Sequence, residues 1–181
     1  MDKTEKEILD AALKVFAEKG YDGAKTKLIA KESGFTEMTL FRKFGTKENL
    51  FHQVLMGNYH GITSDLVQLF SQPMDQSQDP LRRLIMGIIE MVDKNYDYVK
   101  ILITEDHGTS EKVINYGINN LEKFLENVSP EAEIDYRVLA FNIMSFSYFI
   151  IFNKRNGDPF VDFDAAVEEF ITCMASCLKI D

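Results

Sequence analysis

The sequence predicts an all-α protein in which three short helices precede a larger helical bundle. Apolar residues recur at helical spacing, no strand-like alternation of useful length occurs, and the few Gly and Pro residues punctuate the apolar segments. The chain has 181 residues, of which 45% are hydrophobic, so it can bury a sizeable core. We expect two domains, residues 1–46 and residues 47–181.

Capping residues and glycines delimit the first helices. Apolar recurrence predicts a helix over residues 4–19, which Gly20 ends and an Asp22-Gly23 turn follows. A second helix is predicted over residues 26–33, with Gly34 as its stop.

Two N-cap residues mark the starts of the third and fourth predicted helices. Thr36 is a good N-cap for a short third helix through Phe44, and Gly45 ends that helix. Thr46 caps a long fourth helix over residues 47–70. All four prolines lie outside the predicted helices, and the segments between them predict further helices over residues 81–94, 96–107, 110–127, 134–154 and 163–179. The count is about nine helices.

The charge is unevenly distributed along the chain. The formal net charge is −9, yet residues 1–60 hold ten Lys and Arg against nine Asp and Glu. The segment 23–47 is basic, with Lys25, Lys27, Lys31, Arg42, Lys43 and Lys47 against Glu32 and Glu37. Such a patch suits a phosphate-rich partner, although a solvated charged face is the alternative. Acidic residues more than about 8 Å away are largely screened and repel phosphate little.

The second and third helices are joined by the short Gly-containing turn of a helix-turn-helix. This motif places its second helix in the major groove of DNA, where cations and hydroxyls contact phosphates and a few side chains reach base edges. Side chains of these types stand at Lys25, Thr26, Lys27, Thr36, Glu37, Thr39, Arg42, Lys43 and Lys47. Beneath them, a three-helix core is expected from Phe16, Ile29, Leu40 and Phe44.

The stretch "ILDAALKVFAEKGYDGAKTKLIAKESGFTEMTLFRKFGTKENLF", residues 8–51, resembles the DNA-binding region of the tetracycline-repressor (TetR) family of bacterial regulators. The matches run in order through Ala12, Phe16, Gly20-Tyr21, Lys27, Ile29-Ala30, Gly34, Thr39-Leu40-Phe41, Phe44, Lys47 and Leu50-Phe51. The resemblance implies a ligand-responsive regulator, a repressor, that binds a palindromic operator as a homodimer. A small apolar or aromatic effector would release it.

The same resemblance implies residue roles. Thr26, Lys27 and Lys47 would contact phosphates, Thr36, Glu37 and Thr39 would face the groove, and Lys43 would reach a phosphate or base. Three positions depart from the family pattern. Phe41 replaces a Tyr that donates to phosphate, Lys25 replaces a capping Ser or Thr, and Met38 stands where small residues are common.

The last two predicted helices favour a dimer. The helix over 134–154 is apolar nearly all round, which requires burial on several sides. With the final helix it supplies the expected interface: Phe141, Ser145, Tyr148, Phe152, Ala166, Val167, Phe170 and Met174. Alternatively, both helices are core helices of a monomer.

An effector pocket is expected in the bundle, lined by Met56, Tyr59, Ile62, Met86, Ile89, Tyr96, Tyr98, Leu102, Tyr116, Phe141, Met144 and Tyr148. Met, Tyr and Phe suit apolar ligands, but each of these residues taken alone is more often a core residue than a ligand contact. Gly57 and Gly61 lie one turn apart in the fourth helix and mark either a hinge or close packing against a neighbouring helix.

Other functions receive less support. An enzyme would use His52, His60 and His107, but His52 and His60 lack the spacing of paired metal ligands, and no nucleophile, phosphate-loop, cofactor or metal motif appears. A helical module that binds an acidic protein through the third helix is a second alternative. Cys173 and Cys177 form either a redox pair or half a metal site, or they simply pack as small hydrophobic residues, which we favour. We expect a cytoplasmic protein because no signal peptide or membrane-length apolar run occurs.

Overall fold

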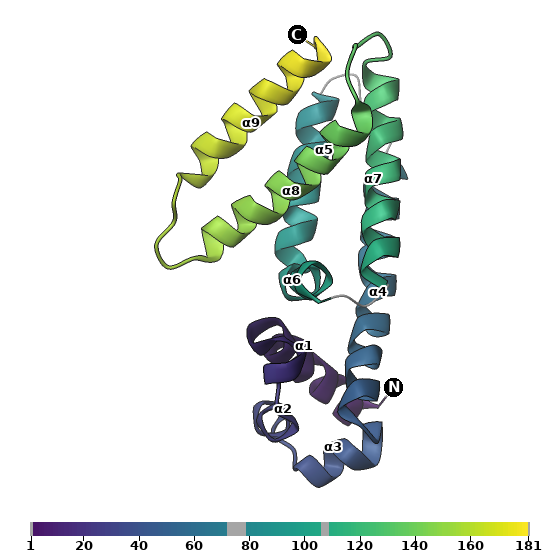
Figure 1. Cartoon of the computed structure of the whole chain (residues 1–181), viewed down its shortest axis with the longest axis vertical. Coiled ribbons are helices and arrows are strands. Elements are labelled where there is room, and N and C mark those ends of the chain that lie inside the picture. The colour runs from purple at the N-terminus through teal and green to yellow at the C-terminus, as the bar shows by residue number, and fades with distance from the viewer. Residues whose placement is uncertain (1, 72–78, 106–108, 181) are drawn as a thin grey trace. The chain divides into compact units, whose positions relative to one another are not determined.

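The computed structural model describes residues 2–71, 79–105 and 109–180, and the elements formed within these residues are nine α-helices without strands (Figure 1). The prediction of an all-α fold is confirmed. The helices are α1 (Lys3–Gly23), α2 (Thr26–Ser33), α3 (Glu37–Phe44), α4 (Lys47–Ser71), α5 (Pro80–Lys94), α6 (Tyr96–Thr104), α7 (Thr109–Val128), α8 (Tyr136–Arg155) and α9 (Phe163–Leu178). Over the described ranges, none of these helices could span a membrane.

The chain forms two compact units. The first comprises Met1–Ile62 and Asn95–Ser110, and the second comprises Thr63–Lys94 and Glu111–Asp181. Helix α4 therefore contributes residues to both units, and α6 belongs with the first three helices. The functional division expected at residue 46 stays a prediction.

The first unit is built around the predicted three-helix core. Helix α1 packs on α2 and α6, and α2 packs on α3. Phe16, Ile29, Leu40 and Phe44 are all buried, as predicted. The ring of Phe16 also meets Phe51 of α4 edge to face, with 4.8 Å between ring centroids. These contacts bury the apolar faces of α1 to α4, and the opposite faces of α2 and α3 stay at the surface.

The backbone leaves the helical conformation at Gly20, as the sequence predicts, and α1 is kinked there. Gly20 has φ 69° and ψ 171°, a region that is essentially restricted to glycine. One further helical turn carries α1 on to Gly23, so the predicted Asp22-Gly23 turn is wrong. The carboxylate of Glu105 accepts a hydrogen bond of 3.1 Å from the backbone N–H of Tyr21 and so satisfies a donor at this break.

Most other helix ends follow their predicted caps. The hydroxyl of Thr36 accepts from the N–H of Thr39, and that of Thr46 accepts from the N–H of Asn49. Two ends differ from prediction. Pro80 is the first residue of α5 rather than a loop residue, because the first helical position needs no N–H donor. Helix α6 ends at Thr104 and not at residue 107.

In the second unit, α5 packs on α8 and α9, and α8 and α9 lie side by side (Figure 1). The rings of Phe146 and Phe170 stack between α8 and α9 with 3.8 Å between centroids. Asp93 at the end of α5 accepts hydrogen bonds from Lys154 at 2.8 Å and from Arg155 at 2.7 Å. These contacts fix the C-terminal end of α8 on α5.

Candidate nucleic-acid interface

The turn between α2 and α3 has the geometry of a helix-turn-helix. Gly34 adopts the left-handed conformation with φ 77°. The N–H of Gly34 donates to the carbonyl of Lys31, and the N–H of Phe35 donates to the carbonyl of Ala30. This pair of bonds is a Schellman motif, which ends a helix by satisfying its last carbonyl groups. The chain can then begin α3 at once, with Thr36 as its N-cap.

Helix α3 has a buried face and an outward face. Leu40 and Phe44 are buried on one side. Met38, Phe41 and Arg42 are exposed on the other, where residues three and four apart are neighbours. Met38 is 81% exposed and Phe41 is 44% exposed. We call these three residues the outward face of α3; its centre is apolar.

The other polar residues of α3 are engaged within the protein. The hydroxyl of Thr26 at the start of α2 donates to Glu37 Oε1 across 2.5 Å. The hydroxyls of Thr36 and Thr39 lie 3.0 Å apart and are hydrogen-bonded to each other. The predicted groove-facing residues are therefore brought together at the N-terminus of α3, where Thr36 and Thr39 bind each other and Glu37 binds Thr26.

Lys43 is held by the first turn of α1. Asp2 and Glu5 form a capping box, and the Lys43 ammonium group bonds to the carboxylates of both, with 3.3 Å between Nζ and Glu5 Oε1. The hydrogen bond from Lys43 lowers the pKa of Asp2, and the same bond raises the pKa of Lys43. The pKa of Glu5 is lowered first by the backbone N–H of Asp2 and then by Lys43. One cation thus faces two anions at the edge of the candidate surface.

The remaining predicted contact residues differ in solvent exposure. Lys25 and Lys27 are exposed at the start of α2, where Lys25 occupies the N-cap position without a capping side-chain bond. Lys47 is half-buried, since its ammonium group lies 4.5 Å from the centroid of the Tyr21 ring and 3.4 Å from the carbonyl oxygen of Asp22. Sequence reasoning missed the roles of Asp2 and Glu5, although the D-x-x-E spacing is a signal for a capping box.

The expected dimer surface is only partly exposed in the single chain. Phe141 and Phe152 are exposed, whereas Tyr148, Val167 and Met174 are buried. Val138 and Phe149 were not predicted, yet they are 54% and 63% exposed and continue the line of Phe141 and Phe152 along α8. Ser145, Ala166 and Phe170 are half-buried. Cys173 and Cys177 are both exposed on α9, so the expectation that they pack is wrong for the single chain.

The expected pocket residues are divided between the two units. Met56, Tyr59, Ile62, Tyr96, Tyr98 and Leu102 belong to the first, and Met86, Ile89, Tyr116, Phe141, Met144 and Tyr148 belong to the second. Tyr98 stands out, because it is 1% exposed and its hydroxyl has no hydrogen-bond partner among the described residues. Burial raises the pKa of Tyr98 to about 12, and Tyr59 adds to this effect.

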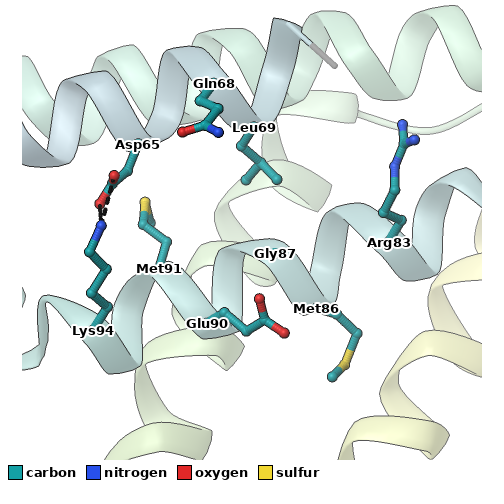
Figure 2. Close-up of a pocket in the computed structure, with 9 residues that line it drawn as sticks. All are labelled: Asp65, Gln68, Leu69, Arg83, Met86, Gly87, Glu90, Met91 and Lys94. Carbon is teal, nitrogen blue, oxygen red and sulfur yellow. Dashed lines mark hydrogen bonds and ion pairs between the residues drawn. The ribbon is translucent and has the colours of Figure 1, made fainter. Parts of the chain in front are cut away.

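A groove of about 390 Å³ in the second unit is lined by α4 and α5 (Figure 2). Asp65 and Lys94 form an ion pair across it at 2.9 Å, and Arg83 and Glu90 add further charges. Of the expected pocket residues it contains only Met86. The charged lining does not match the apolar effector site that the sequence predicts.

The histidines do not form a site in the described part of the chain. His52 and His60 are exposed on α4, and His107 lies outside the described residues. Within residues 2–71, 79–105 and 109–180, no group of three His, Cys, Asp or Glu side chains is placed to hold a metal ion.

Known proteins share the region that forms this surface. The sequence model described as "Bacterial regulatory proteins, tetR family" matches residues 8–54. The transcriptional repressor NicS of Pseudomonas putida is 31% identical over 105 residues, which are 58% of this chain and 49% of NicS. The repressor AcnR of Corynebacterium glutamicum is 44% identical over 45 residues, 25% of this chain and 24% of AcnR. The chain thus spans about half or less of these curated relatives. Both relatives are named as transcriptional repressors.

Solved structures extend the likeness to the whole fold. A TetR-like transcriptional regulator from Rhodococcus sp. RHA1 superposes with a TM-score of 0.77 at 19% identity, over 97% of this chain and 96% of the other. The ketosteroid transcriptional regulator KstR2 of Mycobacterium tuberculosis superposes with a TM-score of 0.75 at 16% identity, over 97% and 95%. Residues 8–54 are thus similar to the TetR family of bacterial regulatory proteins, and the chain shares the fold of TetR-like regulators.

Proposed function

We propose that this protein is a transcriptional repressor that binds a palindromic DNA operator as a homodimer and leaves it when a small apolar or aromatic effector binds. The observation that carries the proposal is the outward face of α3, which is exposed and flanked by the exposed Lys25 and Lys27 at the start of α2. These residues lie within the segment that matches the family. NicS and AcnR are named as repressors, which supports the proposal of repression.

Duplex binding is tested by selection from a random pool, followed by titration at several salt concentrations. A cation that contacts phosphate releases counterions when DNA binds. Lys27→Ala should therefore weaken binding to all duplexes, and the slope of the logarithm of the association constant against the logarithm of the salt concentration should become about one unit less steep. Glu32→Gln, an exposed change on the same helix that leaves every cation in place, is the matched control and should not reduce the slope. A protein-binding module would show no duplex affinity at all.

A homodimer would carry two helix-turn-helix motifs, one for each half of a palindromic site. Support comes from α8, where Val138, Phe141, Phe149 and Phe152 expose apolar surface along one side of the helix. Exposed apolar stripes of this kind mark interaction surfaces. The double variant Phe141→Glu with Phe149→Glu should sediment as a monomer, whereas Asn127→Glu, at an exposed polar position of α7, should remain dimeric. A wild-type chain that sediments as a monomer would contradict the dimer.

The effector proposal rests on the unpartnered hydroxyl of Tyr98 in an apolar interior. A buried hydroxyl without a partner costs about 1–3 kcal/mol, which a polar atom of an otherwise apolar ligand could recover. Tyr98→Phe should therefore raise the free energy of unfolding of the ligand-free protein by about 1 kcal/mol or more. In a screen of aromatic and aliphatic alcohols, the same variant should lose binding of compounds that release wild-type protein from its duplex. Equal binding by both proteins would exclude Tyr98 from the site.

A further inference from the structure

The residues at the centre of the outward face of α3 are apolar. Met38 stands between Phe41 and Arg42 on the side of the helix opposite the buried Leu40 and Phe44. A methionine that is 81% exposed at the centre of a helix face has apolar surface available for a partner. The question is which chemical feature of a duplex this surface fits.

Apart from the exposed Arg42, the polar side chains of this region that could read bases are bonded within the protein. Glu37 accepts from Thr26, and Thr36 and Thr39 are bonded to each other. Lys43 is held by Asp2 and Glu5. These internal bonds hold the four polar side chains in place, whereas Met38 and Phe41 are exposed on the outward face without such bonds.

The major groove displays mainly hydrogen-bonding atoms, and the C5-methyl group of thymine is its distinctive apolar feature. A methionine or phenylalanine set against polar base edges would remove water from them without replacing its hydrogen bonds. Set against thymine methyl groups, the same side chains bury apolar surface on both partners. We infer that Met38 and Phe41 read thymine methyl groups, so that each operator half-site carries thymine where α3 enters the groove. This inference rests on the proposed function.

The test replaces thymine by uracil, which differs from thymine only in lacking the methyl group. A duplex selected by the wild-type protein is resynthesised with uracil at one thymine position in both half-sites, and each position is tested in turn by fluorescence anisotropy. A buried methyl group stabilises the complex, so each thymine methyl group that is lost from the interface should weaken duplex binding about fourfold. At least one thymine in each half-site should show this loss.

Variants then assign the effect to side chains. Met38→Ala and Phe41→Ala should each bind the parent duplex more weakly, and each should abolish the uracil effect at its own thymine. Both side chains are exposed, so the fold should be retained, which circular dichroism and thermal unfolding check. The matched control is Arg42→Ala on the same outward face, which should weaken thymine and uracil duplexes by the same factor because it removes charge and not methyl contact.

The outcomes separate this inference from the proposed function. A wild-type protein that selects a duplex but binds it equally well with uracil at every thymine overturns the inference alone. The inference also fails if Met38→Ala and Phe41→Ala both retain the full uracil effect. A protein that selects no duplex overturns the proposed function and the inference with it.

Discussion

Lys43, in the last turn of the helix-turn-helix, donates a hydrogen bond to Glu5 in the first turn of α1, with 3.3 Å between Nζ and Oε1. Asp2 accepts a second bond from the same ammonium group. A cation that the sequence assigns to DNA is therefore held by two carboxylates in the free protein. A DNA phosphate that bound Lys43 would have to compete with both carboxylates.

Neutralising the two carboxylates should free Lys43 for DNA. Asp2→Asn with Glu5→Gln keeps side-chain oxygens at the capping positions while removing both charges. We expect tighter duplex binding and a steeper salt dependence, by about 0.9 in the logarithmic slope, because one more cation contacts phosphate. The measurement is duplex affinity between low and moderate salt.

Two controls distinguish a released Lys43 from a general change in charge. Glu7→Gln lies on the same helix at an exposed position and should leave the slope nearly unchanged. In a Lys43→Ala background, the Asp2 and Glu5 changes should no longer steepen the slope. A slope that steepens equally in that background would rule out competition for Lys43.

The break in α1 requires glycine at position 20. Gly20 has φ 69°, and a Cβ atom there would lie 3.0 Å from Glu105 Oε1. Gly20→Ala should lower the free energy of unfolding by about 1–3 kcal/mol through backbone strain alone. Gly23→Ala, three residues later with an added Cβ 3.4 Å from that of Lys19, is the matched control. Urea unfolding of both variants checks the difference, and equal stabilities would argue against the strain.

Gly57 and Gly61 in α4 are not needed for close packing. A Cβ atom built at either position meets no described atom within 4 Å, so no described helix packs closely on either glycine, and the hinge stays a prediction. Each change to Ala should raise the free energy of unfolding by about 0.5–1 kcal/mol, since alanine loses less backbone entropy in a helix. If the pair is a hinge, the double variant should also resist effector-induced release from DNA. If the effector releases the double variant from DNA as readily as wild type, the hinge hypothesis is contradicted, and the predicted gain in stability is unaffected.

Asp93 should make stability depend on pH in the acid range. Lys154 and then Arg155 lower the pKa of its carboxyl group in the folded protein. The group therefore stabilises the fold above its ordinary pKa of 3.8, and this contribution is lost as the pH falls through the lower folded value. Asp93→Asn should be less stable than wild type at pH 7 but equally stable once the carboxyl is protonated. Denaturant unfolding from pH 7 downward compares the two, and a constant difference at all pH values would contradict this assignment.

Local signals in the sequence predicted most of the fold. Gly34, Thr36, Gly45 and Thr46 determine helix ends through bonds to residues a few positions away, and each end formed as predicted. Pro80 was misplaced because proline is compatible with both a loop and the first turn of a helix.

The candidate site was less predictable because its polar residues bind partners distant in sequence. Glu37 accepts from Thr26, 11 residues earlier, and Lys43 bonds to Asp2, 41 residues earlier. Residue type and spacing along α3 cannot show such pairings. Only after α1, α2 and α3 are packed does the outward face reduce to Met38, Phe41 and Arg42.

The central claim, that this protein binds duplex DNA through α3, is tested most directly by measuring the affinity of wild-type protein and Arg42→Ala for a selected duplex as a function of salt. The wild-type association constant should fall linearly with salt on logarithmic axes, and Arg42→Ala, on the outward face of α3, should bind more weakly at every salt concentration. A wild-type protein that shows no saturable binding, or an Arg42→Ala variant with unchanged affinity throughout, would contradict the claim.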